Sequence, residues 1–337
     1  MTILVTGGCG YIGSHAVVEL LDAGHHVIIV DNLSNSKVGV VDRIAAICGR
    51  WPIFHEADVR DDTALNALFM IHNIDAVIHF AGSKAVGESV SVPLSYYDNN
   101  IDGARTLLSV MQRHGVRRFV FSSSATVYGD TTTIPYTEDL PLNPINPYGR
   151  TKTAIEWMLN DLYDSEPGWS LSILRYFNPV GAHPSGLIGE DPMGIPNNLM
   201  PYITQVAVGR LPELGIFGDD YPTRDGSCIR DYIHVVDLAR GHLAALDRIK
   251  DKEGLFVHNL GSGEGISVLE LAHAFMEANS VEIPYRIKAR RSGDLPAFWA
   301  DPSKALRDMG WKTEKSVVDI CRDAYRFQQK NPQGYHD

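Results

Sequence analysis

The sequence predicts an α/β protein built on a doubly wound parallel sheet, with a smaller α/β domain on the C-terminal side. Short apolar runs alternate with helical stretches along the first half of the chain. Strands that are apolar along their whole length are typical of a parallel sheet covered by helices on both faces. The expected strand segments are residues 2–6, 27–30, 53–58, 76–80, 118–121 and 171–175.

The regular alternation is lost after residue 178, and residues 178–226 hold much of the glycine and proline of the chain. This change in composition predicts a boundary between a dinucleotide-binding domain, residues 1–177, and a substrate domain, residues 178–337. Further strands are expected at 229–236 and 255–260, and one of them could return to the first domain.

The first strand ends at a glycine-rich turn over residues 7–13, before an expected helix from Ser14 to Ala23 and a strand that leads into Asp31. Glycines here permit a tight turn and a close approach to a pyrophosphate, which lies at the helix N-terminus. The spacing fits both G-x-x-G-x-x-G and G-x-G-x-x-G. Asp31 follows the last glycine at about the distance where a carboxylate meets a ribose 2′-hydroxyl. Because that carboxylate would repel a 2′-phosphate, the sequence predicts NAD rather than NADP.

The remaining helices are expected where apolar residues recur every three or four positions. Ser267 and Glu270 have the spacing of a capping box, which predicts a helix that runs to about Asn279. The other predicted helices cover residues 62–71 and 93–114, a segment that begins near Tyr148, a segment opened by Asp301 and Pro302, and residues 314–329.

Ligands of doubly wound sheets bind beyond the carboxyl ends of the strands. The residues at those ends are Gly7, Asp31, Asp58, Phe80 to Lys84 and Ser124. Asp58 could accept a hydrogen bond from an adenine or cap the following helix. The basic run 286–291 is either a solvated strand or an anion site that faces a diphosphate.

Tyr148 and Lys152 are expected one turn apart on one face of a helix that begins after Asn146 and Pro147. A tyrosine that acts as a base at neutral pH must lose about three units from its usual pKa of about 10. A neighbouring ammonium would lower the pKa by roughly one to three units, and a second cation would supply the rest. The ordinary alternative is a surface tyrosine stacked on a lysine stem.

Composition limits the classes of function. The chain has 337 residues, 44% of them hydrophobic and 21% charged, with a net charge of −11. We expect no nucleic-acid partner, because such proteins usually carry a basic face. The four cysteines lack disulfide or zinc spacing, and no histidine group has metal-site spacing, so no metal is predicted. With no signal peptide or membrane span recognisable, a cytoplasmic location is expected.

Several segments together resemble the UDP-galactose 4-epimerases of the extended short-chain dehydrogenase/reductase family, over essentially the whole chain. The matching segments are TGGCGYIG (6–13), HFAGSKAVGES (79–89), SSSATVYG (122–129), YGRTK (148–152), RYFNPVGAH (175–183), PNNLMP (196–201) and RDYIH (230–234). The first and fourth occur in many dehydrogenases, whereas the combination of the later segments indicates the epimerases.

The resemblance implies a Rossmann-type first domain with tightly held NAD, and a UDP-hexose, UDP-galactose or UDP-glucose, between the two domains. It assigns Tyr148 as the base on the sugar 4-hydroxyl and Lys152 as a ligand of the nicotinamide ribose. Ser124 would bind the same hydroxyl. It also suggests a homodimer through helices near 93–114 and 148–165. The candidate dimer contacts, which could equally be core, are Leu107, Leu108, Met111, Met158, Leu159 and Leu162.

The resemblance also implies two sets of binding residues. The cofactor set is Gly7, Gly10, Tyr11, Ile12, Gly13, Asp31, Asn32, Asn35, Ser36, Asp58, Val59, Phe80, Ala81, Gly82, Lys84, Asn99, Ser122, Tyr148, Lys152, Tyr176 and Phe177. The substrate set is Lys84, Ser124, Thr126, Tyr148, Asn178, Asn197, Asn198, Leu199, Ile216, Phe217, Arg230, Tyr232, Arg291, Asp294 and Phe298.

One departure from the family bears on specificity. Phe298 stands where members carry either a bulky tyrosine or a small residue, and a small residue is associated with room for an N-acetyl group. We therefore expect little activity on N-acetylated sugars. Ser83 also departs from the usual apolar residue, with no consequence assigned.

Two other functions would use the same fold. A nucleotide-sugar 4,6-dehydratase would share the fold. Members of that group resemble one another in an Asp-Glu pair, just after the position of Ser124, that eliminates water. This chain has Ala125, Thr126 and Val127 there, so the acid-base pair for elimination is missing. A non-catalytic NAD-sensing regulator would need the glycine loop but not the tyrosine-lysine pair.

Overall fold

A seven-stranded parallel sheet organises the larger part of the chain in the computed structural model, which describes residues 1–291 and 293–335. The strand order is β10-β6-β5-β4-β1-β2-β3, which confirms the doubly wound prediction. The strands are β1 (Thr2–Thr6), β2 (His26–Asp31), β3 (Ile53–Glu56), β4 (Ala76–His79), β5 (Arg118–Ser124), β6 (Ser170–Tyr176) and β10 (Gly254–Leu260). The order reverses between β1 and β4, where such sheets bind their ligands.

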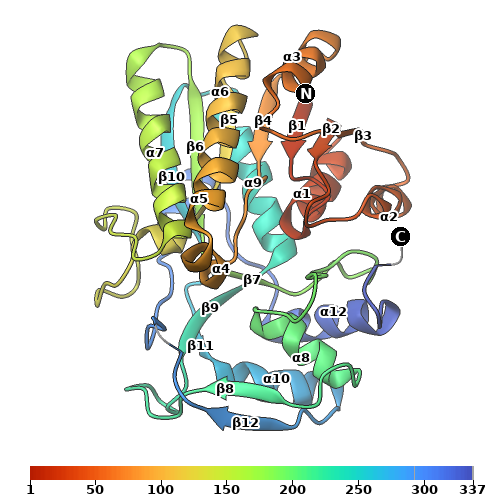
Figure 1. The fold of residues 1–337 in the computed structure, drawn as a ribbon, viewed down its shortest axis with the longest axis vertical. Helices are drawn as coiled ribbons and strands as arrows, with labels where there is room; N and C mark the ends of the chain where they lie inside the picture. The colour runs from red at the N-terminus through yellow and green to blue at the C-terminus, as the bar shows by residue number, and fades with distance from the viewer. Residues whose placement is uncertain (292, 336–337) are drawn as a thin grey trace.

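Helices cover both faces of this sheet (Figure 1). On one face lie α1 (Tyr11–Asp22), α2 (Gly39–Cys48) and α9 (Val235–Lys250), which share one buried apolar cluster. On the other face lie α3 (Asp62–Ile71), α6 (Gly103–Arg113) and α7 (Pro147–Ser165), which share a second cluster. The last strand, β10, comes from far along the chain and pairs with β6, so the C-terminal half contributes to this sheet.

Helix α1 begins at Tyr11, three residues earlier than expected, because Gly10 already serves as its N-cap. The predicted helix over 93–114 is interrupted. The structure has α4 (Val86–Ser91), α5 (Pro93–Tyr96) and a π-helix η1 (Tyr97–Asp102) before α6. The π-helix contains Asn100, whose buried amide accepts from Ser83 N at 2.8 Å and donates to Ser83 O at 3.0 Å. This side chain fixes the turn that follows β4, and π-turns are frequent at functional sites.

The smaller part lies at the carboxyl edge of the large sheet, at the bottom of Figure 1. Its strands are β7 (Asn178–Val180), β8 (Leu214–Phe217), β9 (Ile229–His234), β11 (Gly265–Ser267) and β12 (Tyr285–Lys288). Its helices are α8 (Leu199–Ala207), α10 (Val268–Asn279) and α12 (Val317–Lys330), whereas α11 (Ser303–Met309) packs against α9 and β10 of the larger part. A 3₁₀ turn η2 (Ala125–Val127) follows β5. The predicted capping box of Ser267 and Glu270 is confirmed at the start of α10.

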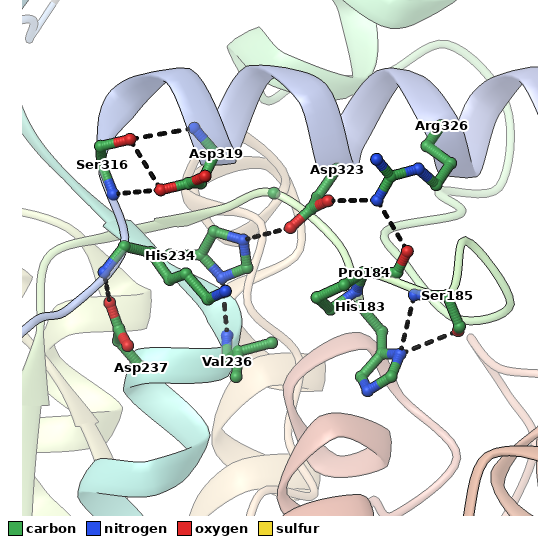
Figure 2. Close-up of polar contacts among 12 residues, drawn as sticks. His183, Pro184, Ser185, His234, Val236, Asp237, Ser316, Asp319, Asp323 and Arg326 are labelled. Carbon is green, nitrogen blue, oxygen red and sulfur yellow. Dashed lines mark hydrogen bonds and ion pairs between the residues drawn. The ribbon is translucent and has the colours of Figure 1, made fainter.

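Polar contacts join α12 to the larger part of the chain (Figure 2). Asp323 on α12 lies 3.4 Å from His234 Nε2 and accepts from Arg326, which also donates to Pro184 O at 2.7 Å. His234 Nδ1 accepts from Val236 N at 3.1 Å and thereby caps α9. Because α9 packs on the large sheet, these contacts hold the two parts together.

Candidate active site

The glycine loop between β1 and α1 has the shape of a phosphate cradle. Gly7 has a φ of +69°, and a Cβ there would lie 2.7 Å from Ala81 N. A Cβ on Gly13 would lie 2.2 Å from Gly7 O, so only glycine fits. Gly10 caps α1 without a side chain, and the first turn of α1 carries no acidic residue. The N–H groups of that first turn therefore remain available to an anion, which fits a dinucleotide diphosphate.

Asp31 is fixed beside this loop at the carboxyl end of β2. Its Oδ1 accepts from Leu33 N at 3.0 Å and Ser36 Oγ at 2.7 Å, and its Oδ2 accepts from Cys9 N at 3.0 Å. A carboxylate has room for about four acceptor bonds, so capacity remains for ribose hydroxyls. The loop and Asp31 together fit NAD.

Asp58 does not cap α3, so that alternative is wrong. Asp61 is the N-cap and accepts from Ala64 N at 3.0 Å. Asp58 instead pairs with Arg60 at 2.7 Å and accepts from Asn32 Nδ2 at 3.0 Å. The hydrogen bond from Arg60 is the main reason why the pKa of Asp58 lies well below its usual value. The predicted contact of Asp58 with adenine stays a prediction.

Helix α7 delivers Tyr148 and Lys152 to the end of β5. Asn146 caps the helix by accepting from Gly149 N at 2.8 Å, and Pro147 occupies the first turn, as predicted. Lys152 is buried and donates to Ser122 O at 2.7 Å, while its Nζ lies 5.9 Å from the centre of the Tyr148 ring.

The side chain of Ser124 lies beside that of Tyr148 and acts to lower the tyrosine pKa. The Oγ of Ser124 accepts from Thr126 N at 3.2 Å and Thr126 Oγ1 at 3.0 Å. The structure therefore brings the expected base, its hydroxyl partner and the lysine together at the carboxyl edge of the large sheet.

Burial dominates the pKa values of this group. Burial raises the pKa of Tyr148 to about 12, and the neighbouring Ser124 acts in the opposite direction. Burial also lowers the pKa of Lys152 to about 8, against the attraction of Glu156. Burial is the largest influence on the Tyr148 pKa in the polypeptide alone, so the expected lowering of that pKa by Lys152 stays a prediction.

The segment after β4 closes the same site. Gly82 lies so close to Asn100 and Lys152 that a Cβ there would be 3.2 Å from Asn100 Oδ1 and 3.9 Å from Lys152 Nζ. Asn99 Nδ2 donates to Ser83 Oγ at 3.2 Å. Gly82 therefore borders Lys152 near the start of α7, and Asn99 contacts the same turn through Ser83.

Glu190 is a site candidate that the sequence did not single out. Its Oε1 lies 2.9 Å from Lys84 Nζ and accepts from Asn198 Nδ2 at 2.7 Å. Lys84 and Asn198 come from opposite parts of the chain, so Glu190 connects an expected cofactor residue to an expected substrate residue. A single acid in an irregular segment gives no sequence signal for this role.

Two arginines of the smaller part are held by aromatic rings. The guanidinium of Arg230 lies 4.6 Å from the centre of the Phe298 ring, and its Nη2 lies 3.5 Å from Asp294. The guanidinium of Arg291 lies 3.8 Å from the centre of the Phe217 ring. Stacking of this kind orients a guanidinium for multidentate pairing with phosphate.

The other members of the basic run are accounted for differently. Arg286 and Lys288 lie on β12, all of whose residues are exposed, and Arg290 pairs with Asp220 at 2.7 Å. Within this run, Arg291 is the residue that remains a phosphate candidate.

The remaining substrate candidates are placed unequally. Asn178 Oδ1 is buried without a hydrogen-bond partner in the described residues, which fits a polar ligand. Asn198 is the N-cap of α8 and Leu199 its first residue, while Asn197 is exposed. Ile216 and Tyr232 pack in the apolar core of the smaller part, so the structure does not present their side chains as a surface.

Phe298 forms part of an aromatic wall. Its ring lies 6.0 Å from both Tyr136 and Phe177, centre to centre. Both neighbours are buried, so the wall has solid support.

Among the described residues, we find no helix with the length and apolar character needed to cross a bilayer.

Comparisons with known proteins agree with this geometry. A model of the NAD dependent epimerase/dehydratase family matches residues 3–261. The chain is 56% identical over 336 residues to the UDP-glucose 4-epimerase of Dictyostelium discoideum, across 99% of this chain and 98% of that protein. It is 53% identical over 335 residues to the UDP-glucose 4-epimerase of Bacillus subtilis, across 99% of both chains.

Solved structures give the same result. The fold matches the UDP-glucose 4-epimerase of Stenotrophomonas maltophila with bound NAD and formylated UDP-arabinopyranose, with a TM-score of 0.96, 52% identity and 98% of each chain covered. It matches the Bifidobacterium longum enzyme in complex with NAD+ and UDP with a TM-score of 0.96 and 51% identity, across 99% of this chain and 100% of that one. The glycine cradle beside Asp31, the tyrosine-lysine pair at the sheet edge and these full-length matches lead to one conclusion: the chain belongs to the NAD dependent epimerase/dehydratase family.

Proposed function

We propose that this protein interconverts UDP-galactose and UDP-glucose by oxidation and re-reduction at C4 of the sugar, with NAD as cofactor, a step of galactose metabolism. The observation that carries the proposal is the meeting of Tyr148, Ser124 and Lys152 beside the glycine cradle. The relatives named UDP-glucose 4-epimerase, two of them solved with NAD, support it.

The residues divide the work. The dinucleotide is held by Gly7, Gly10, Gly13 and Asp31. When bound, it supplies a reversible hydride acceptor, C4 of the nicotinamide ring, and a positive charge near Tyr148. Tyr148 takes the proton of the 4-hydroxyl and holds it until the sugar is reduced again, and Ser124 hydrogen-bonds the same hydroxyl. Because burial alone raises the pKa of Tyr148, its function as a base requires nearby positive charge.

The nucleotide must stay anchored while the 4-ketose turns over. Arg230 and Arg291 are the proposed diphosphate ligands, and Asp294 accepts from the nucleotide ribose. Asn178 and Asn198 supply further polar contacts. We propose that the part of the chain up to residue 177, with β10, binds NAD and the rest binds the UDP-sugar. A cytoplasmic location is proposed from the same reasoning.

The aromatic wall of Phe298 limits the sugar. Phe298 packs against Tyr136 and Phe177, so moving its ring aside would cost the free energy of these contacts. We therefore propose that glucose and galactose fit and that N-acetylated sugars are largely excluded.

A coupled assay tests the function. The purified holoprotein is first incubated with UDP-galactose without added NAD, and the reaction is stopped by heat. The UDP-glucose formed is then detected in a second step with UDP-glucose dehydrogenase and NAD. Steady turnover is expected without added NAD, since the cofactor is held tightly. Bound nicotinamide without turnover would favour the regulator, and release of a 4-keto-6-deoxy sugar would favour the dehydratase.

We also infer a homodimer, through α4, α5 and α7. The apolar residues that the sequence suggests for this contact belong mostly to the core: Leu107, Leu108, Met111 and Leu159 are buried, and Met158 and Leu162 pack against the same cluster. Other residues of this region are exposed instead, with Leu94 at 82%, Val90 at 63% and Trp157 at 59%. A row of large exposed apolar side chains fits burial against a second copy.

A further inference from the structure

A buried ion pair lies directly behind the groups proposed for the chemistry. Glu156 on α7 and Arg175 on β6 have side chains that are 2% and 6% exposed. Arg175 Nη2 lies 2.6 Å from Glu156 Oε2, and its Nε lies 3.1 and 3.2 Å from the two carboxylate oxygens. Such forked pairing fixes both side chains.

Glu156 shares a helix face with the reacting groups. Tyr148, Lys152 and Glu156 follow one another at intervals of four residues along α7, so they lie on successive turns of one face. This face is directed at the carboxyl end of β5.

Three consecutive serines of β5 each contact one residue of that face. Ser122 O accepts from Lys152 Nζ at 2.7 Å, Ser123 Oγ donates to Glu156 Oε1 at 2.5 Å, and Ser124 lies beside Tyr148. In the parallel pairing of β5 with β6, Ser123 stands opposite Arg175. The carboxylate thus ties the helix to both strands.

The pair extends toward the C-terminal half. Arg175 Nη1 donates to Tyr128 OH at 3.0 Å, and Tyr128 OH donates to Asn259 Oδ1 at 2.7 Å. Asn259 lies on β10, so the network reaches the strand that returns from the smaller part.

The carboxylate also balances charge. Lys152 and Arg175 are two buried cations. Glu156 carries a negative charge one helical turn after Lys152, on the same face of α7. Burial lowers the pKa of Lys152, and the charge of Glu156 opposes that effect.

Building on the function proposed above, we propose that Glu156 is a positioning residue for the reaction: held by Arg175, it fixes the Tyr148 and Lys152 face of α7 against β5 and keeps Lys152 an ammonium. A purely structural ion pair would behave differently. Buried ion pairs can often be replaced by apolar residues of similar size without loss of stability. A positioning role and a purely structural role of Glu156 are therefore distinguished by measurements of catalysis and of the Lys152 titration, not by measurements of stability.

The primary variant is Glu156→Gln, which keeps the shape and one oxygen acceptor but removes the charge. The matched control is Glu166→Gln, which removes a carboxylate that also pairs with an arginine, Arg117, at the far end of the same helix. The values of kcat and KM for UDP-galactose are measured across the pH range in which lysine titrates. In parallel, the titration of Lys152 is followed by NMR in protein labelled at lysine Cε, with Lys152→Met used for assignment.

For Glu156→Gln we expect kcat to fall at least about tenfold with KM nearly unchanged, because misplaced reacting groups cost up to about 10²-fold. The alkaline limit of kcat and the Lys152 titration should both move to lower pH, by about one unit. Glu166→Gln should match the parent in all three. An unchanged Lys152 titration together with an unchanged kcat would overturn the proposal.

Two further outcomes are distinguished. If parent and control both fail to turn over UDP-galactose, the proposed function falls, while the NMR titration still tests the effect of Glu156 on Lys152. If Glu156→Gln does not fold, the apolar pair Glu156→Met with Arg175→Met replaces it. Parent-like kcat and Lys152 titration in the folded double variant would show a merely structural pair and overturn the proposal.

Discussion

Ser124 at the end of β5 and Tyr148 in the first turn of α7 lie side by side, close enough for the serine to act on the tyrosine pKa. This placement brings two hydroxyl groups together, so a single carbinol of a substrate can contact both. The base and its partner are thus already oriented by the polypeptide.

Removal of the phenolic oxygen should abolish most of the activity. In Tyr148→Phe we expect kcat for UDP-galactose to fall by two or more decades, since a positioned proton-transfer group contributes roughly 10²–10⁴-fold. Tyr163→Phe, which alters an exposed ring on the same helix, should leave kcat unchanged. A residual rate above about a tenth of the parent in Tyr148→Phe would contradict the assignment.

A methyl group in the phosphate cradle should release the cofactor. The Cβ of Gly13→Ala would lie 2.2 Å from Gly7 O, so the turn must open. We expect loss of copurified nicotinamide and a destabilisation of about 1–3 kcal/mol in denaturant unfolding. Gly87→Ala, whose Cβ meets nothing within 4 Å, is the control and should keep the cofactor. Full cofactor content in Gly13→Ala would show that the cradle lies elsewhere.

A smaller residue in the aromatic wall should broaden specificity. Phe298→Ser removes the ring that lies 6.0 Å from Tyr136 and Phe177, which leaves space beside the sugar. We expect the ratio of kcat/KM for UDP-N-acetylglucosamine over UDP-glucose to rise at least about tenfold. Phe298→Tyr keeps the bulk and should leave the ratio low. Comparable rates on both sugars in the parent protein would refute the exclusion.

Acid should destabilise the fold through its buried histidines. Burial lowers the pKa of His79 to about 3 and of His242 to about 4, so both are neutral in the folded state. In the unfolded chain these histidines bind protons below about pH 6.5, whereas in the folded protein they remain neutral. Their full contribution to the free energy of unfolding is therefore present above about pH 6.5 and is lost as the pH drops toward 4. Each such histidine adds up to about 1.4 kcal/mol per pH unit to the slope. Urea unfolding between neutral pH and pH 5 measures this slope.

The variant His79→Phe isolates one contribution. Its ring can still pack against Phe119 and Phe121, near His79 in the fold. Whatever its stability at neutral pH, its slope should be smaller by about one proton. An unchanged slope would show that His79 does not titrate as described.

Charge on the exposed apolar row should disrupt the dimer. Leu94→Glu places a carboxylate at a side chain that is 82% exposed, so the monomer should tolerate it. We expect a shift from dimer to monomer in analytical ultracentrifugation, with an unchanged melting temperature at low concentration. Met70→Glu, at a similarly exposed position on α3, should remain dimeric. A dimeric Leu94→Glu would move the interface elsewhere.

Local patterns in the sequence predicted the large sheet and the helix that carries Tyr148, because apolar runs, glycine spacing and caps act over a few residues. Tertiary contacts escaped that reasoning. The π-helix depends on Asn100 closing onto Ser83, and Glu190 gains its role only when Lys84 and Asn198 meet. No spacing rule pairs residues so far apart in the chain.

The apolar faces show the same limit. Leu107 and Leu94 are equally apolar in sequence, yet one is core and the other exposed, because the broken helix over 93–113 turns its faces differently from a regular one. Likewise, Arg175 looks out of place in an apolar strand until Glu156 is seen beside it.

The late return of β10 has a consequence for anyone who would divide this protein. A fragment cut after residue 177 would leave β6, whose seven residues are all buried in the intact chain, as a naked border with unpaired amides and carbonyls. It would also lose α9, which shields one side of the sheet. Neither residues 1–177 nor the remainder of the chain can therefore be replaced by the corresponding segment of a relative. New specificities have to be engineered by substitutions within the intact chain.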